Sequence, residues 1–180
     1  MSRTNPDKKK RRAASQTLLM YGEGLGEEIF LKYLRSLYAR DSGVAVTIRK
    51  GKGGNAVSII IDATNTPGAF DKRVVIMDND RGEQEMTRAR EAARQRGVEL
   101  LENSPCLEAI LLSTLNNGQS YPNKNSDWCK SEFESKYLDK KKRTEINEYG
   151  KIFPKNMLDE QRRKVRDLNR LVLLMEGDNS

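Results

Sequence analysis

The sequence predicts an α/β fold, in which a parallel sheet of about four strands carries helices on both faces and a helical extension follows at the C-terminus. Three observations lead to this class. Short apolar runs alternate with segments whose apolar residues recur at helical spacing. Turn residues separate the two kinds of segment. The remainder, from residue 119, is highly charged and contains only helix patterns.

The segments before residue 70 alternate strand and helix patterns. The run TLLMY, residues 17–21, is a short apolar strand that ends at GEGLG, and apolar residues then recur at helical spacing up to Tyr38. A second strand is expected at VAVTIR, residues 44–49. The next segment, AVSIIIDA, fits a helix or a strand by pattern alone. We expect a helix, because a crossover must precede the next parallel strand and Asn55 can act as its N-cap.

The alternation continues with RVVIM as the third strand. An Asp-Asn-Asp stretch follows it, and a polar helix, EQEMTRAREAARQR, then ends at Gly97, which suits a C-cap. VELLE is the fourth predicted strand. After it we expect a buried apolar helix, CLEAILLSTL, with Ser104 as its N-cap and Pro105 as its first residue.

Three regions follow from these patterns. Residues 16–118 form the α/β domain, and residues 119–180 form the helical extension, with helices expected near residues 126–138 and 155–175. Residues 1–15 have too few apolar side chains to offset the entropy of ordering. We interpret them as a disordered basic arm.

The positive charge is unevenly distributed. The formal net charge is +7, and most of the excess lies in the first dozen residues, which include Lys8, Lys9, Lys10, Arg11 and Arg12. Such an arm either contacts nucleic-acid phosphates or only keeps the chain in solution. A second basic cluster at residues 139–143 is open to the same two interpretations.

The composition excludes several kinds of chemistry. The chain contains no histidine, which removes histidine general bases, Ser-His-Asp and Cys-His nucleophiles and histidine zinc sites. Cys106 and Cys129 lack metal-ligand spacing and are too few for a disulfide framework. No segment approaches the roughly 20 apolar residues of a membrane span. We therefore expect a cytoplasmic protein without membrane contact.

Acidic side chains follow two of the predicted strands. Glu23 comes after the first strand, and Asp78 and Asp80 come after the third. If these strands are neighbours, as in flavodoxin-like strand order, the three carboxylates share one crevice at the carboxyl edge of the sheet. Their mutual repulsion favours a hard cation, Mg²⁺ or Mn²⁺, and hence phosphodiester or phosphoryl chemistry. The alternative is structural, with the aspartates capping the next helix and Glu23 serving as a turn residue.

Further candidates lie near these acids. Glu27 and Glu108 each fall in the first turn of a predicted helix, where they either add acidic ligands or only stabilise the helix dipole. The GKGG segment with Lys50 and Lys52 offers amides and charge to a phosphate, as does Arg81, but the segment lacks P-loop spacing.

The motifs, in order, are LLMYGEGLGEEIFLKYL, GKGGNAVSIIIDA, VVIMDNDRG and ENSPCLEAILL. A Glu after the first strand and an Asp-x-Asp after the third resemble the signature of Toprim domains. Over residues 17–115 the chain is most similar to RloB-like proteins, Toprim-related proteins of restriction and phage-defence loci. The resemblance implies that Glu23 is a general acid/base and that Asp78 and Asp80 bind the metal. It also implies an ABC-class ATPase as partner.

The leading hypothesis is a Mg²⁺-dependent nuclease that cleaves DNA or RNA, with a defence role implied by the resemblance. The chain departs from the family where Leu25 and Gly26 replace Lys-Thr and where Ser113-Thr114 replaces a His, which keeps a second hypothesis open. In this second hypothesis the chain is a non-catalytic nucleic-acid-binding or regulatory subunit that docks on the ATPase. The apolar stripe of the last helix would then be the docking surface, although such a stripe can also be part of the hydrophobic core. A phosphotransfer domain is a third hypothesis. Such a domain normally needs a lysine on a later strand, and the absence of a suitable lysine after VELLE argues against it.

Overall fold

The computed structural model describes residues 14–177. Residues 8–12, which carry the cationic cluster of the predicted basic arm, lie outside the described residues. No helix within residues 14–177 is long and apolar enough to cross a membrane.

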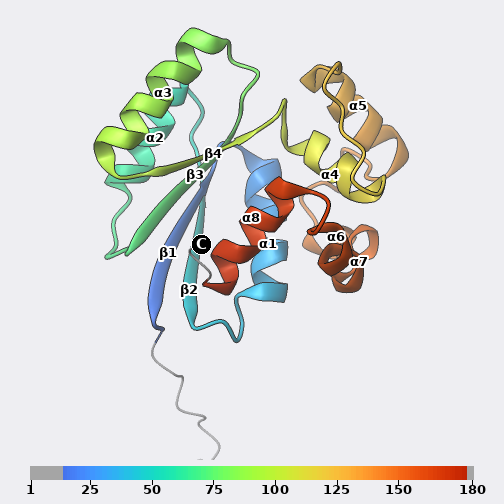
Figure 1. The fold of residues 1–180 in the computed structure, drawn as a ribbon, viewed down its shortest axis with the longest axis horizontal. Helices are drawn as coiled ribbons and strands as arrows, with labels where there is room; N and C mark the ends of the chain where they lie inside the picture. The colour runs from blue at the N-terminus through green and yellow to red at the C-terminus, as the bar shows by residue number, and fades with distance from the viewer. Residues whose placement is uncertain (1–13, 178–180) are drawn as a thin grey trace, which may run out of the picture.

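A four-stranded parallel sheet forms the centre of the molecule, with strand order β2-β1-β3-β4 (Figure 1). The α/β class is therefore confirmed. The strands are β1 (Gln16–Gly22), β2 (Val44–Lys50), β3 (Lys72–Asp78) and β4 (Glu99–Asn103). β1 and β3 are neighbours, as the flavodoxin-like order requires, with Gly22 opposite Ile76. The residues that follow these two strands consequently meet at the same edge of the sheet.

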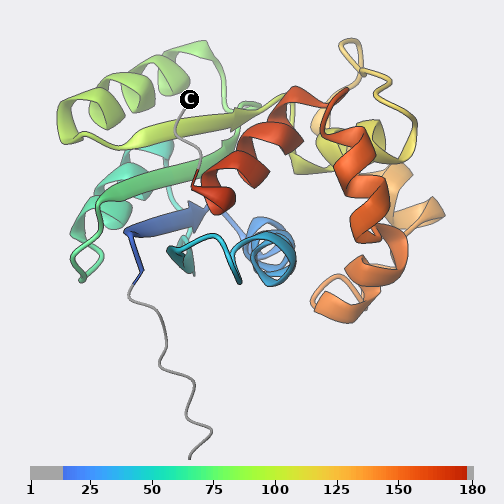
Figure 2. The ribbon, with the colours of Figure 1, turned by 60° about the horizontal axis from the view of Figure 1, so that its bottom comes forward.

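Helices cover both faces of the sheet (Figures 1 and 2). β3 shows why, because Val74 and Ile76 enter one hydrophobic core whereas Val75 and Met77 enter the other. The second core lies under α2 and α3, and the first under α1, α4 and α8. The helices are α1 (Leu25–Tyr38), α2 (Ala56–Asn65), α3 (Glu83–Arg96), α4 (Leu107–Leu115), α5 (Ser126–Lys136), α6 (Ile146–Ile152), α7 (Lys155–Gln161) and α8 (Arg166–Glu176).

Two expected helix ends are confirmed. Asn55 is the N-cap of α2, and its side chain accepts a hydrogen bond from the Ser58 amide at 2.9 Å. Gly97 ends α3 in the left-handed conformation, with φ of 63°. Because left-handed backbone favours glycine, the α3 terminus was readable from local sequence.

The expected start of α4 is wrong. The helix begins at Leu107, with Cys106 in the N-cap position, and Ser104 and Pro105 precede it. The Cys106 side chain makes no capping hydrogen bond. The Leu107 amide instead donates to Asp78 Oδ1 at 3.0 Å. A carboxylate from β3 thus replaces the local cap, which no local pattern predicts.

The C-terminal extension differs from the expectation in two ways. The helix expected over residues 155–175 is divided into α7 and α8, and Arg162 spans the break by pairing with Glu176 of α8 at 2.7 and 2.9 Å. α6 lies outside the two helices that the sequence predicts for the extension. Gly150 lies against Tyr33 of α1, where a Cβ would be in van der Waals contact at 3.6 Å.

The extension packs onto the sheet domain and shares its core. Phe153 and Tyr149 contact the ring of Phe30 in α1, with ring centroids 5.9 and 6.0 Å apart. The apolar stripe of α8 is buried in the same core: Leu168, Leu171, Val172 and Met175. This stripe is therefore core and is not exposed as a docking surface.

Truncating Leu168 should destabilise the whole chain. Its side chain is fully buried in the core that α8 shares with the α/β domain, so Leu168→Ala should lower the free energy of unfolding by about 2–5 kcal/mol. Arg166→Ala, an exposed position in the same helix, is the control and should change it by less than about 0.5 kcal/mol. Urea denaturation monitored by circular dichroism measures both, and equal effects would contradict the packing described.

Candidate functional site

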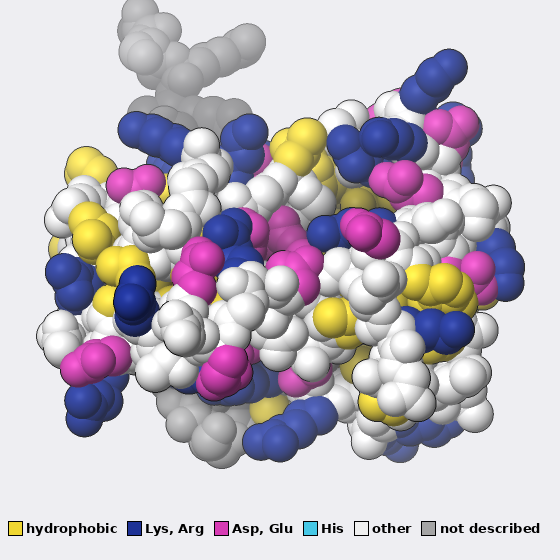
Figure 3. Space-filling model, turned by 90° about the horizontal axis from the view of Figure 1, so that it is seen from above, with side chains coloured by type: hydrophobic (Ala, Val, Ile, Leu, Met, Phe, Trp, Pro, Cys, Tyr) yellow, Lys and Arg dark blue, Asp and Glu magenta, His cyan; other side chains and the backbone are white. Residues whose placement is uncertain are grey.

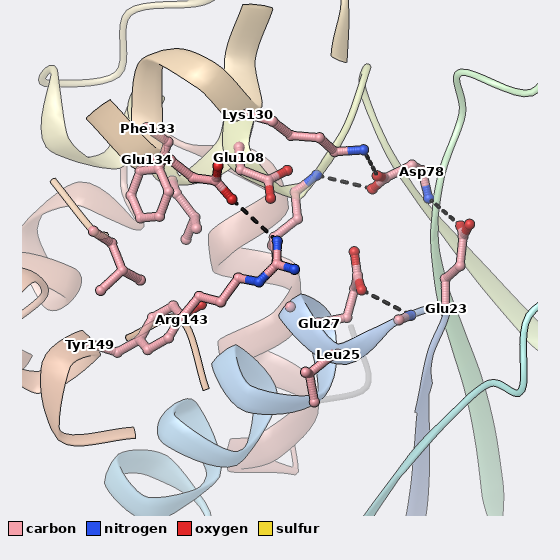
Figure 4. Close-up of a pocket in the computed structure, with 15 residues that line it drawn as sticks. Glu23, Leu25, Glu27, Asp78, Glu108, Lys130, Phe133, Glu134, Arg143 and Tyr149 are labelled. Carbon is pink, nitrogen blue, oxygen red and sulfur yellow. Dashed lines mark hydrogen bonds and ion pairs between the residues drawn. The ribbon is translucent and has the colours of Figure 1, made fainter. Parts of the chain in front are cut away.

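An acidic cavity of about 240 Å³ lies at the carboxyl edge of the sheet (Figure 4). Residues of the α/β domain form one wall, and residues of α5, Arg143 and Tyr149 from the extension form the other. Acidic side chains gather in a central hollow beside basic ones in the view onto this end of the molecule (Figure 3). The carboxylates that line the cavity are Glu23, Glu27, Asp78, Glu108 and Glu134.

Glu23 lies at the turn between β1 and α1. Its Oε2 accepts a hydrogen bond from the Asp78 amide at 3.1 Å, and its Oε1 pairs with Arg81. The turn is tight, since a Cβ on Gly22 would lie 2.7 Å from the Cβ of Glu27. Glycine at this position therefore lets the first turn of α1 approach the end of β1 and brings Glu23 and Glu27 to the same cavity.

Asp78 ends β3 and is held by three neighbouring elements. Its Oδ1 accepts hydrogen bonds from Asn103 Nδ2 of β4 at 3.2 Å and from the Leu107 amide of α4 at 3.0 Å. Its Oδ2 lies 3.6 Å from the Lys130 ammonium of α5. Burial raises the pKa of Asp78 to about 6, even though the Asn103 hydrogen bond and the Lys130 charge favour the ionised form.

Glu27 has a structural role and also lines the cavity. It is the third residue of α1, and its Oε2 accepts a hydrogen bond from the Gly24 amide at 3.0 Å. Only 8% of the residue is exposed. Burial and then the negative charge of Asp78 raise the pKa of Glu27 to about 7. At neutral pH this carboxyl group is therefore partly protonated.

Glu108 supplies the best test of whether the site fits a cation. Its Oε2 is buried and accepts no hydrogen bond from any residue between 14 and 177. Ligand atoms of Glu108, Asp78 and Cys106 lie within 4.8 Å of one another. Burial raises the pKa of the Cys106 thiol, which stays protonated and is a poor ligand for a hard cation. The two carboxylates together fit Mg²⁺ or Mn²⁺.

Sequence reasoning missed the cations that face these acids. Lys130 lies beside Asp78, and Arg143 pairs with Glu134 through Nη1 at 3.2 Å (Figure 4). Arg143 belongs to the basic cluster noted at residues 139–143, but nothing in that cluster indicated which strand end it would reach. Lys130 carried no signal, because α5 shows only a weak apolar pattern in a charged segment.

Asp80 and the two lysines of the GKGG segment do not line the acidic cavity. Asp80 is exposed, although its negative charge helps to raise the pKa of Lys130. Lys50 and Lys52 are also exposed.

Arg81 connects the GKGG segment to the acidic site. Its Nη1 donates to the Gly54 carbonyl at 2.9 Å while Nη2 pairs with Glu23. The segment also approaches Glu23 directly, since a Cβ on Gly51 would lie 2.8 Å from the Glu23 carbonyl oxygen. Arg81, expected from the sequence to bind phosphate, here holds a carboxylate and a loop together.

A scan against protein-family models and searches of curated proteins and of solved structures found no match to this chain. The geometry of the cavity thus carries the functional argument. It combines carboxylates at two neighbouring strand ends, of which Asp78 is buried, with cations from the extension. Such a site can bind a divalent cation and a phosphate side by side.

The raised pKa of Glu27 predicts a pH-dependent stability. Between about pH 4.5 and 7 the folded chain binds more protons at Glu27 than the unfolded chain, so the free energy of unfolding falls as pH rises. Glu27→Gln should flatten this fall by an amount on the order of 3 kcal/mol across the window. Urea denaturation at a series of pH values without divalent cations measures it. Parallel profiles for the two proteins would refute the burial of an ionisable Glu27.

Proposed function

We propose that the chain is a divalent-metal-dependent nuclease that hydrolyses phosphodiester bonds in DNA or RNA. The observation that carries the proposal is the buried Glu108 oxygen without a hydrogen-bond donor, next to Asp78 at the end of β3. An unsatisfied buried carboxylate beside another is costly unless a cation joins them. The resemblance to Toprim-type, RloB-like proteins adds cytoplasmic phage defence as the expected setting.

Asp78 and Glu108 would hold Mg²⁺ or Mn²⁺, and the exposed Asp80 would add a ligand from outside the cavity lining. When bound, the cation supplies neutralisation of phosphate charge and orientation of a water molecule. Asp80 lies close enough to Lys130 to act on its pKa, which supports a position near the site.

The remaining residues divide the other tasks. Glu23 would accept and return a proton as the general acid/base, held in place by the Asp78 amide and Arg81. Each oxygen of its carboxylate still has a lone pair for this purpose. Lys130 and Arg143 would bind the phosphate that enters the cavity, because they are the cations that line it.

Cleavage of labelled single- and double-stranded DNA and RNA tests the proposal. Wild-type protein should cut only with Mg²⁺ or Mn²⁺, and Asp78→Asn or Glu108→Gln should each lower the rate by at least about 100-fold. Asp80→Asn should lower it less, because water can replace an exposed ligand. Asp167→Asn, an exposed acid in α8, is the matched control and should cut like wild type. Cleavage that survives Asp78→Asn would disprove the assigned site.

Lys130 should weaken metal binding in the resting protein. Its ammonium lies 3.6 Å from Asp78 Oδ2 and therefore competes with a cation for this carboxylate. Lys130→Met should tighten Mn²⁺ binding, measured by calorimetry, by about 10-fold, which corresponds to one modest ion-pair contribution. The same substitution should slow cleavage if Lys130 binds the substrate phosphate. Unchanged or weaker Mn²⁺ binding would show that Lys130 and the metal do not share Asp78.

A second candidate function is a non-catalytic nucleic-acid-binding or regulatory subunit that works with an ABC-class ATPase. The favouring observation is that Asp78 and Glu23 already have protein partners, so part of the acidic cluster also fits a structural cap. Under this reading Mn²⁺ does not bind, and the nucleic acid is bound without being cut. The cleavage and calorimetric measurements separate the two functions.

A further inference from the structure

Three hollows of the helical extension join into one path. The acidic cavity shares Glu134 and Leu138 with a second hollow of about 540 Å³ at the end of α5. That hollow shares Lys136 and Tyr137 with a third, of about 470 Å³, on the other side of α5. The three hollows are therefore neighbours along α5.

The third hollow is aromatic. Tyr121 and Trp128 line it, with ring centroids 5.7 Å apart and an interplanar angle of 37°. Tyr137, also in its wall, is 36% exposed. Asn116 Nδ2 donates to the Tyr121 hydroxyl at 2.8 Å and so fixes that ring. Figure 3 shows apolar side chains with basic ones beside them on the side of the extension.

Each hollow contains cations beside acids, which are Glu132 in the aromatic hollow, Glu134 and Asp139 in the middle one and five carboxylates in the acidic cavity. Lys130 and Arg143 lie in the acidic cavity, Lys140 lies in the middle hollow, and Lys124 lies in the aromatic one. The Lys124 ammonium is 4.6 Å from the centre of the Trp128 ring. Lys124 and Lys140 form no ion pair within residues 14–177, so both are available to an anion.

We propose that this path binds single-stranded nucleic acid and that the aromatic hollow stacks an unpaired base on Trp128. Exposed aromatic side chains with an adjacent lysine suit single strands, because every base has a face to stack. A duplex hides those faces within its own stack. The base takes the place of the Lys124 ammonium over the indole, and the ammonium then binds the adjacent phosphate. The inference rests on the proposed nuclease function and names its substrate class.

The fluorescence of Trp128 tests the stacking directly, because the chain contains a single tryptophan. In EDTA, which separates binding from cleavage, an oligothymidylate of about ten nucleotides should quench this fluorescence. An abasic oligonucleotide of the same length keeps the phosphates but has no bases, and it should quench little. A duplex of the same length should also quench little.

Variants test which side chains contribute to binding. Their affinities for oligothymidylate are measured by the fluorescence anisotropy of the labelled strand. Trp128→Ala should weaken binding by about 10-fold, in the range for loss of one stacked base. Phe70→Ala is the matched control and should bind like wild type. Phe70 precedes β3 at the end opposite Asp78, and Arg73 lies 5.2 Å from its ring. If Trp128→Ala fails to fold, Lys124→Glu decides, with a loss of affinity expected. Lys155→Glu, another lysine over an aromatic ring, should then have no effect.

Several results would overturn the path. They are equal quenching by the abasic strand, preference for the duplex, and unchanged affinity in Trp128→Ala and Lys124→Glu. If metal-dependent cleavage that needs Asp78 persists alongside such a result, only the single-strand path fails. If the strand binds and quenches but no metal-dependent cleavage occurs with any substrate, the path stands and the nuclease function fails.

Discussion

The buried carboxylate of Asp78 is the group on which the site depends. Its oxygens contact β4 through Asn103, the first amide of α4 through Leu107 and α5 through Lys130. A buried carboxylate is stable only if its oxygens are satisfied, so the four elements are held in a common arrangement around it. The same requirement explains why α4 begins at Leu107 and not at the locally favoured cap.

The parallel sheet positions this group and also constrains what can surround it. Because both faces of a parallel sheet are covered, the carboxyl edge is where polar side chains of neighbouring strands can meet. Glu23 and Asp78 meet there because β1 and β3 are paired. The extension then closes the edge on one side, so the cavity has an acidic wall from the α/β domain and a wall from the extension that carries its cations.

Some carboxylates of the cavity have a cationic partner and others have none, and this difference supports the proposed function. Glu23 has Arg81, and Glu134 has Arg143, whereas Glu27 and Glu108 have no cationic partner among the described residues. Burial, and after it repulsion from neighbouring carboxylates, raises the pKa of Glu27 to about 7 and that of Asp78 to about 6. Such a cluster is typical of sites that bind a cation or carry a proton, and a purely structural cap would not need the additional acids.

The sequence by itself indicated the sheet, its flanking helices through α3 and the caps at Asn55 and Gly97, because these depend on local periodicity, turn residues and the crossover that parallel strands need. It brought Glu23 and Asp78 together only on the condition that β1 and β3 are neighbours, which the structure meets. It also indicated Glu27 and Glu108 as acids of first helical turns. Only the tertiary structure decided the cap of α4, the division between α7 and α8, the outward position of Asp80 and the approach of Lys130 and Arg143. Each of these depends on contacts between segments far apart in the chain. The local spacing of apolar and polar residues does not reveal such contacts.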